Sequence, residues 1–268
     1  MHFDIQQTRI YVHTGATPWQ AHQPTVLCLH GVLCDHSVWQ PIEAGLAQLG
    51  WNVAAIDLPG HGLSSGAAPQ SVAEAAAWIP RLMAAMGLEQ AALMGHSWGS
   101  LIALEAAAQL GPRASHLALV GTASPMTVAP ALLELAHSDP PQAMALIDKY
   151  SRSSATPADF DGQALGRRVL ASNPDCNVLE RGLRACNGYD SALQAMQRVT
   201  APTLFIVGEY DRMTPAKAAQ GLIAQAQARD GVSTQVATLA CGHQHMVDAA
   251  APMLQALEGL LGRPGKSA

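Results

Sequence analysis

A Gly-x-Ser-x-Gly pentapeptide, Gly95 to Gly99, lies between a short apolar run at 91–94 and an Ala- and Leu-rich segment of helical character. This order predicts a strand that turns abruptly into a helix, which strains the backbone at Ser97 and lifts its side chain above the sheet. Neither glycine has a β-carbon, so the strand and the helix can approach each other closely. Free N–H groups at the start of the helix would stabilise negative charge beside the serine. The pattern therefore predicts a nucleophilic serine, and a Ser/Gly turn without chemistry is the alternative.

Short apolar runs alternate with helical patterns along most of the chain. The runs that predict strands, in addition to the one before Ser97, lie at 8–13, 25–29, 53–56, 117–120, 203–207 and 234–239. The helical patterns lie at 37–49, 71–86, 214–228 and 250–261, in addition to the one that follows Ser97. Continuously apolar strands that alternate with helices indicate an α/β fold with a mostly parallel, twisted sheet covered by helices on both faces.

Residues 125–199 interrupt this alternation. They contain short helical patterns at 130–137, 140–149, 163–171 and 177–186, separated by prolines, and no convincing strand. A helical stretch between two strands of one sheet predicts an inserted helical cap. The expected organisation is thus a core formed by 1–124 and 200–262, a cap at 125–199, and a flexible tail at 263–268.

The composition is that of one globular protein with a generous core. Apolar residues make up 49% of the chain and charged residues 13%, about half the usual share. The net charge of −5 and the absence of any Lys/Arg cluster disfavour nucleic acid and anionic membranes as partners. The sequence also shows no signal-peptide pattern, no apolar run near the roughly 18 residues of a membrane span, and no CxxC among its five cysteines. We therefore expect a cytoplasmic protein that acts on a small molecule, with an oligomeric state that the sequence does not indicate.

A serine nucleophile needs a base that a third group holds in place, and on this topology the acid and then the histidine follow the serine in the chain. The loop after the 203–207 strand offers Glu209 and Asp211, of which Asp211 is favoured because it lies in the turn before a helix, although it could simply cap that helix. After the last strand, His243 at the strand exit is favoured over His245 as the base. His243 and His245 could also ligate a metal, but no third ligand stands at matching local spacing, so we expect no metal and no cofactor.

The expected oxyanion hole consists of two backbone N–H groups, from Trp98 and from Val32 in the loop after the 25–29 strand. The candidate pocket residues are His30, Leu33, Met126, Met144, Met213 and His245. His30 is mainly interpreted as a residue that fixes its loop by hydrogen bonds. The apolar side chains of the cap favour a small or medium, mostly apolar substrate. Five cap arginines could bind a substrate carboxylate, but solvated helix faces are the favoured interpretation for Arg152, Arg167, Arg168, Arg181 and Arg184.

The chain resembles the α/β-hydrolase superfamily, in its capped serine-hydrolase branch that includes esterases and enol-lactonases. The resemblance is carried by Leu29-His30-Gly31, by 57–64, by the pentapeptide 95–99, by 208–211, and by Gly242-His243 with Asp248 five residues after the histidine. It implies the α/β-hydrolase fold with its elbow serine, late-strand acid and terminal histidine at Ser97, Asp211 and His243. It also implies that the cap lies over the mouth of the site.

The leading hypothesis is a serine hydrolase that cleaves a small to medium carboxylic ester or lactone through an acyl-enzyme on Ser97. One alternative is hydrolysis of a carbon–carbon bond in ring-cleavage products, but the relatives with this activity carry a Gly-Pro-Gly-like loop where this chain has 32–35, Val-Leu-Cys-Asp. Dehalogenases and epoxide hydrolases are disfavoured because they place Asp at the position of Ser97. A ligand receptor on the same fold is the non-enzymatic alternative.

Overall fold

One sheet of eight strands organises the computed structural model, which describes residues 1–15 and 17–264. The strands are β1 (His2–Ile5), β2 (Thr8–His13), β3 (Thr25–Leu29), β4 (Asn52–Ile56), β5 (Ala91–His96), β6 (Ala114–Val120), β7 (Thr203–Gly208) and β8 (Thr234–Leu239). Their order in the sheet is β1-β2-β4-β3-β5-β6-β7-β8. The pairings of β1 with β2 and of β2 with β4 are antiparallel and all others are parallel, so the prediction of a mostly parallel sheet is confirmed.

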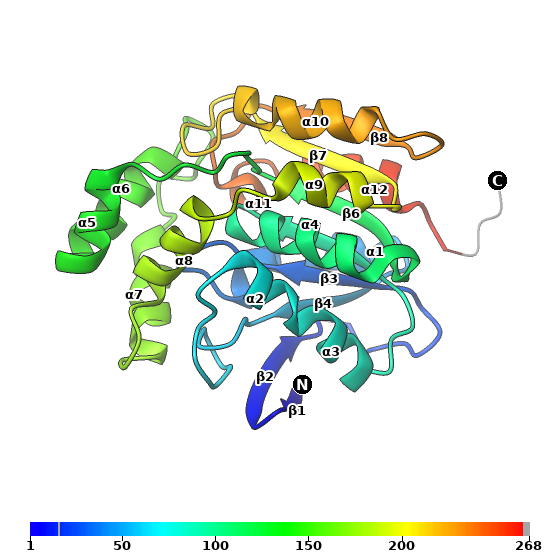
Figure 1. The fold of residues 1–268 in the computed structure, drawn as a ribbon, viewed down its shortest axis with the longest axis horizontal. Coiled ribbons are helices and arrows are strands. Elements are labelled where there is room, and N and C mark those ends of the chain that lie inside the picture. The colour runs from blue at the N-terminus through cyan, green and yellow to red at the C-terminus, as the bar shows by residue number, and fades with distance from the viewer. Residues whose placement is uncertain (16, 265–268) are drawn as a thin grey trace.

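Helices cover both faces of the sheet, because side chains of the buried strands alternate between the two sides. In β3, Leu27 and Leu29 enter one core cluster and Val26 and Cys28 the other. The first cluster is covered by α2 (Val72–Ala76), α3 (Trp78–Ala85), α4 (Trp98–Leu110), α9 (Ala192–Arg198) and α10 (Gln220–Gln227), and the second by α1 (Gln40–Gln48) and α12 (Ala250–Leu261). Figure 1 shows α2, α4 and α9 in front of the sheet and α12 behind it. The prediction of a sheet covered on both faces is therefore confirmed.

Several element boundaries differ from the sequence prediction for local reasons. The single helix expected at 71–86 is divided into α2 and α3, because Pro80 has no N–H for the carbonyl four residues earlier and its ring clashes with that carbonyl. The helix expected at 37–49 begins as a 3-10 turn, His36–Trp39, before α1. The strand β1 was not predicted, since only Ile5 of its four residues is buried. No helix in the described residues is both long enough and apolar enough to span a membrane.

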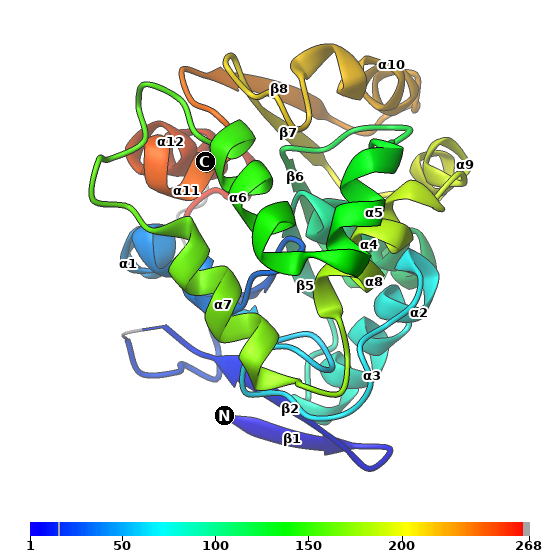
Figure 2. The same cartoon turned by 90° about the vertical axis from the view of Figure 1, so that its left-hand side faces the viewer.

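Four helices of the inserted segment lie at the end of the sheet where the parallel strands terminate. They are α5 (Pro130–Ser138), α6 (Pro140–Ser151), α7 (Gly162–Ser172) and α8 (Val178–Asn187), and Figure 2 shows α5, α6 and α7 in front of the strand ends. We call α5 to α8 the cap. The fifth helix of the segment, α9, packs on α4, and its Ala192, Ala195 and Met196 belong to the core cluster of the sheet. Of the expected tail, residues 265–268 lie outside the described residues.

Candidate active site

Ser97 forms the turn between β5 and α4, as the sequence predicts. Its backbone has φ 54° and ψ −120°, a conformation that non-glycine residues rarely adopt. Trp98 is the first residue of α4, so its N–H belongs to the first turn, whose amides have no partner within the helix. The strained turn thus presents a hydroxyl next to the N-terminus of α4.

The two glycines of the pentapeptide allow β5, α4 and β3 to approach one another at the elbow. A β-carbon at Gly95 would overlap the carbonyl oxygen of Gly99, and one at Gly99 would overlap the carbonyl oxygens of Leu29 and His30. All of these obstacles are backbone atoms, which cannot move aside as a flexible side chain can. The requirement for glycine at both positions is therefore steric.

We expect Gly99→Ala to lower the free energy of unfolding by more than about 4 kcal/mol, or to prevent folding, because the added methyl group meets backbone. Urea unfolding of the purified variant measures the effect. Gly259→Ala in α12 is the matched control, since its β-carbon would lie 3.6 Å from Gln235 Oε1, in ordinary contact. Alanine is also favoured over glycine in a helix by about 1 kcal/mol. Equal urea midpoints for Gly99→Ala and the unmodified protein would refute this account of the elbow.

His243 and Asp211 come together from the loops after β8 and β7. Nδ1 of His243 donates a hydrogen bond to Oδ2 of Asp211 at 2.8 Å, and both side chains are buried. The carboxylate also accepts hydrogen bonds from the backbone N–H groups of Met213 and Thr214 and from the Thr214 hydroxyl, each at 2.8 Å. Burial raises the pKa of Asp211, but the charge and hydrogen bond of His243 and the Thr214 amide outweigh it and hold this pKa well below its usual value. Asp211 is therefore an ionised partner for His243, and Nε2 of the ring is left as the acceptor.

Ser97 and His243 line the same cavity, which has a volume of about 500 Å³. Among the described residues, no hydrogen bond joins the Ser97 hydroxyl to the His243 ring. Such bonds are often long in unliganded enzymes and tighten when substrate binds. The structure thus brings the serine, the histidine and the acid selected from the sequence to one site, while Glu209 is exposed and makes no side-chain hydrogen bond among the described residues.

The loop after β3 passes directly beside the serine. A β-carbon at Gly31 would lie 3.3 Å from the β-carbon of Ser97, and the next residue, Val32, lines the cavity. Within the described part of the chain, the Val32 N–H makes no hydrogen bond. The Trp98 side chain is buried away from the cavity, against the rings of His30 and His61. The loop that carries Val32 and the first turn of α4, which starts at Trp98, therefore both lie next to Ser97.

Two of the six residues predicted for the pocket line the cavity. They are Met126 and Met213. The apolar residues beside them include Val128 before α5 and Leu132, Leu135, Leu146 and Ile147 of α5 and α6. The other four predicted residues, His30, Leu33, Met144 and His245, do not line it. Leu33 and Met144 are buried in the core of the cap instead. His30 donates from Nδ1 to the Gly31 carbonyl at 2.8 Å and accepts the Leu58 N–H at Nε2, so it fixes its loop.

The charged group that reaches the cavity was missed from the sequence. The five cap arginines bond to other protein groups and none of them lines the cavity. Among the described residues, Arg212, from the core loop after β7, is the one lysine or arginine in the lining. It donates to the Lys149 carbonyl at 2.6 Å and its guanidinium lies 5.2 Å from the Tyr150 ring. Arg212 directly follows Asp211 in the sequence, and this adjacency could have indicated that it lies near the site.

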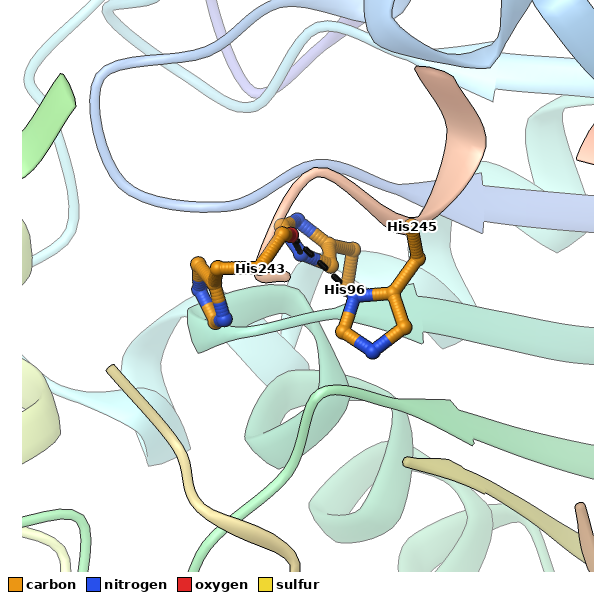
Figure 3. A group of neighbouring side chains, drawn as sticks. All are labelled: His96, His243 and His245. Atoms are coloured by element: carbon orange, nitrogen blue, oxygen red, sulfur yellow. Dashed lines mark hydrogen bonds between the residues drawn. The ribbon is translucent and has the colours of Figure 1, made fainter. Parts of the chain in front are cut away.

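Two further histidines hold the loop that carries His243. Nε2 of His96 donates to the His243 carbonyl at 2.9 Å, and Nδ1 of His245 donates to the same oxygen at 3.1 Å (Figure 3). A carbonyl only accepts, so these contacts determine which nitrogen carries the proton in both rings. His245 is therefore an anchor for His243 rather than a pocket residue.

The structure also places a third histidine beside His243 and His245, whereas the sequence analysis found no third metal ligand at matching local spacing. His96 joins His243 and His245, and the three residues offer ligand atoms within 4.8 Å of one another. The local spacing could not show this third histidine, which lies 147 residues before His243. Each of the three rings already uses one nitrogen in a hydrogen bond, to the His243 carbonyl or to Asp211.

His245 makes the stability of the fold depend on pH. Burial, and then repulsion from His243, lower the pKa of His245 to about 4, whereas an unfolded histidine has a pKa of about 6.5. Between these values the unfolded chain binds more protons, so the free energy of unfolding falls as the pH drops through this window. From pH 7 to pH 5 this one residue accounts for a loss of about 2 kcal/mol.

We expect His245→Gln to reduce the loss of stability between pH 7 and pH 5 by that amount, as measured by urea unfolding at both pH values. The control is His22→Gln, at an exposed position, which should retain the full pH dependence. An unchanged pH dependence in His245→Gln would show that the folded protein does not hold this ring neutral.

Comparisons with known proteins agree with this architecture. Residues 24–144 match the family model described as the alpha/beta hydrolase fold. The chain is 30% identical over 189 residues to a 2-succinyl-6-hydroxy-2,4-cyclohexadiene-1-carboxylate synthase of Serratia proteamaculans, covering 69% of this chain and 71% of the relative. It is also 30% identical over 236 residues to a pimeloyl-[acyl-carrier protein] methyl ester esterase of Xanthomonas oryzae, covering 77% and 85%.

The fold is shared with solved structures of low sequence identity. An enol-lactonase from Burkholderia xenovorans superposes with a TM-score of 0.81 at 18% identity, over 97% of this chain and 99% of that one. An esterase from Exiguobacterium antarcticum superposes with a TM-score of 0.79 at 20% identity, over 96% and 97%. The matched family model and the two relatives, which are 30% identical and align over most of both chains, show that the chain belongs to the α/β-hydrolase family.

Proposed function

We propose that this protein is a serine hydrolase that cleaves a small to medium carboxylic ester or lactone through an acyl-enzyme on Ser97. The observation that carries the proposal is the strained Ser97 turn, which opens into the same cavity as His243, whose other ring nitrogen is held by Asp211. The relative named as a methyl ester esterase, aligned over 85% of its length, supports ester chemistry.

In the proposed reaction the Ser97 oxygen attacks the substrate carbonyl while Nε2 of His243 takes the hydroxyl proton. Asp211 stays ionised and stabilises the imidazolium that forms. The N–H groups of Val32 and Trp98 donate to the oxyanion of the tetrahedral intermediate. When the intermediate collapses, the C–O bond breaks and His243 gives its proton to the leaving oxygen. A water molecule then attacks the acyl-enzyme, with His243 as the base, and releases the acid and the free serine.

The cavity favours a substrate whose acyl or alcohol part is apolar. Its wall is formed largely by aliphatic and methionine side chains from α5, α6 and the segment before α5, and its volume of about 500 Å³ suits a small to medium molecule. Among the described residues, Arg212 is the one lysine or arginine in this wall. A substrate of this class loses water from its apolar part on entry, which supplies binding energy without a charged partner.

A combination of turnover and covalent labelling tests the proposal. The purified protein is incubated with p-nitrophenyl butyrate and, separately, with a fluorophosphonate probe that reacts with activated serines. Release of p-nitrophenol together with labelling of one serine is the expected result. If the protein is not labelled and does not release p-nitrophenol, the ligand-receptor alternative is favoured. Labelling without hydrolysis of any ester or lactone tested would favour carbon–carbon bond hydrolysis.

A further inference from the structure

We propose that the cap helices α7 and α8 hold the loop of residues 31–35 in the conformation that places the Val32 amide beside Ser97. On this inference Arg168 and Gly182 are positioning residues for the oxyanion hole, although neither lines the cavity. The inference rests on the proposed function for its kinetic consequence. Three contacts between the cap and this loop carry it.

The first contact is between Val32 and the backbone of α8. A β-carbon at Gly182 would lie 3.0 Å and 3.1 Å from the two γ-carbons of Val32. Any side chain here would push the valine away, so glycine lets the helix lie directly on it. Valine has few side-chain conformations, so it cannot rotate away when its methyl groups are displaced, and its backbone must shift with them. The position of α8 therefore limits where the Val32 N–H can lie.

The second contact is made by Leu33, which enters the hydrophobic core of the cap. Its backbone has φ 58°, in the left-handed region that a leucine rarely adopts. Its side chain is buried among cap residues, and a β-carbon at Gly166 of α7 would lie 2.9 Å from both Leu33 Cδ2 and Met144 Sδ. Strained backbone persists where surrounding packing determines it. The cap, rather than the sheet, thus supplies the packing that holds the turn at Val32 and Leu33.

The third contact is an ion pair between the end of the loop and α7. Oδ2 of Asp35 accepts from Nη2 of Arg168 at 2.8 Å and from Nε at 3.2 Å, and Oδ1 accepts from the Ser37 N–H at 2.9 Å. Asp35 is 2% exposed. Burial raises the pKa of Asp35, but the hydrogen bonds from Ser37 and Arg168 outweigh it and keep this pKa below its usual value. Because the carboxylate is buried and ionised, losing Arg168 would leave a buried charge without its ionic partner.

Together the contacts at Val32, Leu33 and Asp35 connect three of the five residues of the loop to the cap. An oxyanion donor acts only when it lies about 2.7–3.1 Å from the position that the oxyanion will occupy. A small displacement of the Val32 N–H would therefore weaken transition-state binding and leave substrate binding almost unchanged. The expected signature of a disturbed cap contact is a lower kcat at a nearly constant KM.

The test compares Arg168→Gln with Arg167→Gln. Both side chains lie on α7 with similar exposure, 58% and 57%, but Arg167 pairs with Asp161, which is itself 58% exposed. We expect Arg168→Gln to lower kcat for p-nitrophenyl butyrate about 10-fold and to leave KM within about twofold. This loss of kcat is smaller than the roughly 10²- to 10³-fold loss that follows complete removal of an oxyanion-hole donor. Arg167→Gln should keep both constants, and Arg168→Lys should recover part of kcat.

Two further readouts separate positioning from a general structural effect. The Ki of a trifluoromethyl ketone, whose adduct with the serine carries an oxyanion, should rise in proportion to the loss of kcat in Arg168→Gln. The Ki of the matching alcohol, which forms no adduct, should stay constant. Hydrogen–deuterium exchange of a peptide spanning 31–35 should be faster in Arg168→Gln and unchanged in Arg167→Gln.

The proposal is overturned if kcat is unchanged in Arg168→Gln, if the loss appears in KM, or if Arg167→Gln shows the same loss. A protein with no turnover would refute the proposed function, and the exchange experiment would still decide this inference. In that case, equal exchange of 31–35 in Arg168→Gln and the unmodified protein would show that the cap does not hold the loop.

Discussion

Ser97→Ala is expected to lower kcat for p-nitrophenyl butyrate by about 10⁵- to 10⁶-fold, to near the background rate. The substitution removes the oxygen that forms the acyl-enzyme, and His243 has no other hydroxyl to activate at that position. The oxyanion donors and the cavity remain, so a small residual acceleration over water should persist. Steady-state rates and the mass of the intact protein after fluorophosphonate treatment measure the two effects. The variant should show no added mass.

The matched control for this prediction is Ser151→Ala. Ser151 also lines the cavity and is buried, and its backbone carbonyl accepts the backbone N–H of His243 at 2.8 Å, a bond that does not involve the hydroxyl. Ser151→Ala should therefore remain labelled, with kcat within about threefold. If Ser97→Ala is still labelled and Ser151→Ala is not, the nucleophile has been assigned to the wrong serine.

His243→Ala is expected to lower kcat by about 10⁴- to 10⁶-fold, because the imidazole takes the proton in acylation and returns it to the leaving oxygen. The loss should be similar to that of Ser97→Ala, and the double variant should lose little more, since the two residues act as a unit. Steady-state kinetics of the two single variants and the double variant measure this non-additivity.

The comparison for this prediction is His245→Ala. It loses one of the two hydrogen bonds to the His243 carbonyl, while the bond from His96 remains, so kcat should stay within about tenfold of the unmodified protein. If His245→Ala were as inactive as His243→Ala, the assignment of the base would be wrong. Circular dichroism of each variant checks that the fold is retained.

Most strands of the sheet and the candidate nucleophile could be predicted because both depend on local sequence. Buried parallel strands are short, continuous apolar runs, and Gly95 to Gly99 combine the strand end, the turn and the helix start in five residues. The choice of Asp211 and His243 needed only the chain order and the position of each residue after a strand. The strand β1 was missed because an exposed edge strand has no such apolar signal.

The cavity wall and the groups around the site could not be predicted, because they depend on which face of each cap helix meets which neighbour. Leu33 and Met144 are as apolar as Met126, yet they fill the core of the cap, and nothing in their local sequence distinguishes the two locations. Arg168 resembles Arg167 in sequence, but only the fold brings it to Asp35, 133 residues away.

The sequence by itself determined the positions of seven of the eight strands, the serine at the strand-to-helix turn, and the candidates Asp211 and His243 that follow it in the chain. Each of these features is encoded within a few neighbouring residues. Tertiary structure alone decided which nitrogens of His96 and His245 carry protons, which side chains line the cavity, and how the cap holds the loop at Val32. The physical reason is that these features arise from contacts between segments far apart in the chain, where packing and burial choose among residues of the same chemical type.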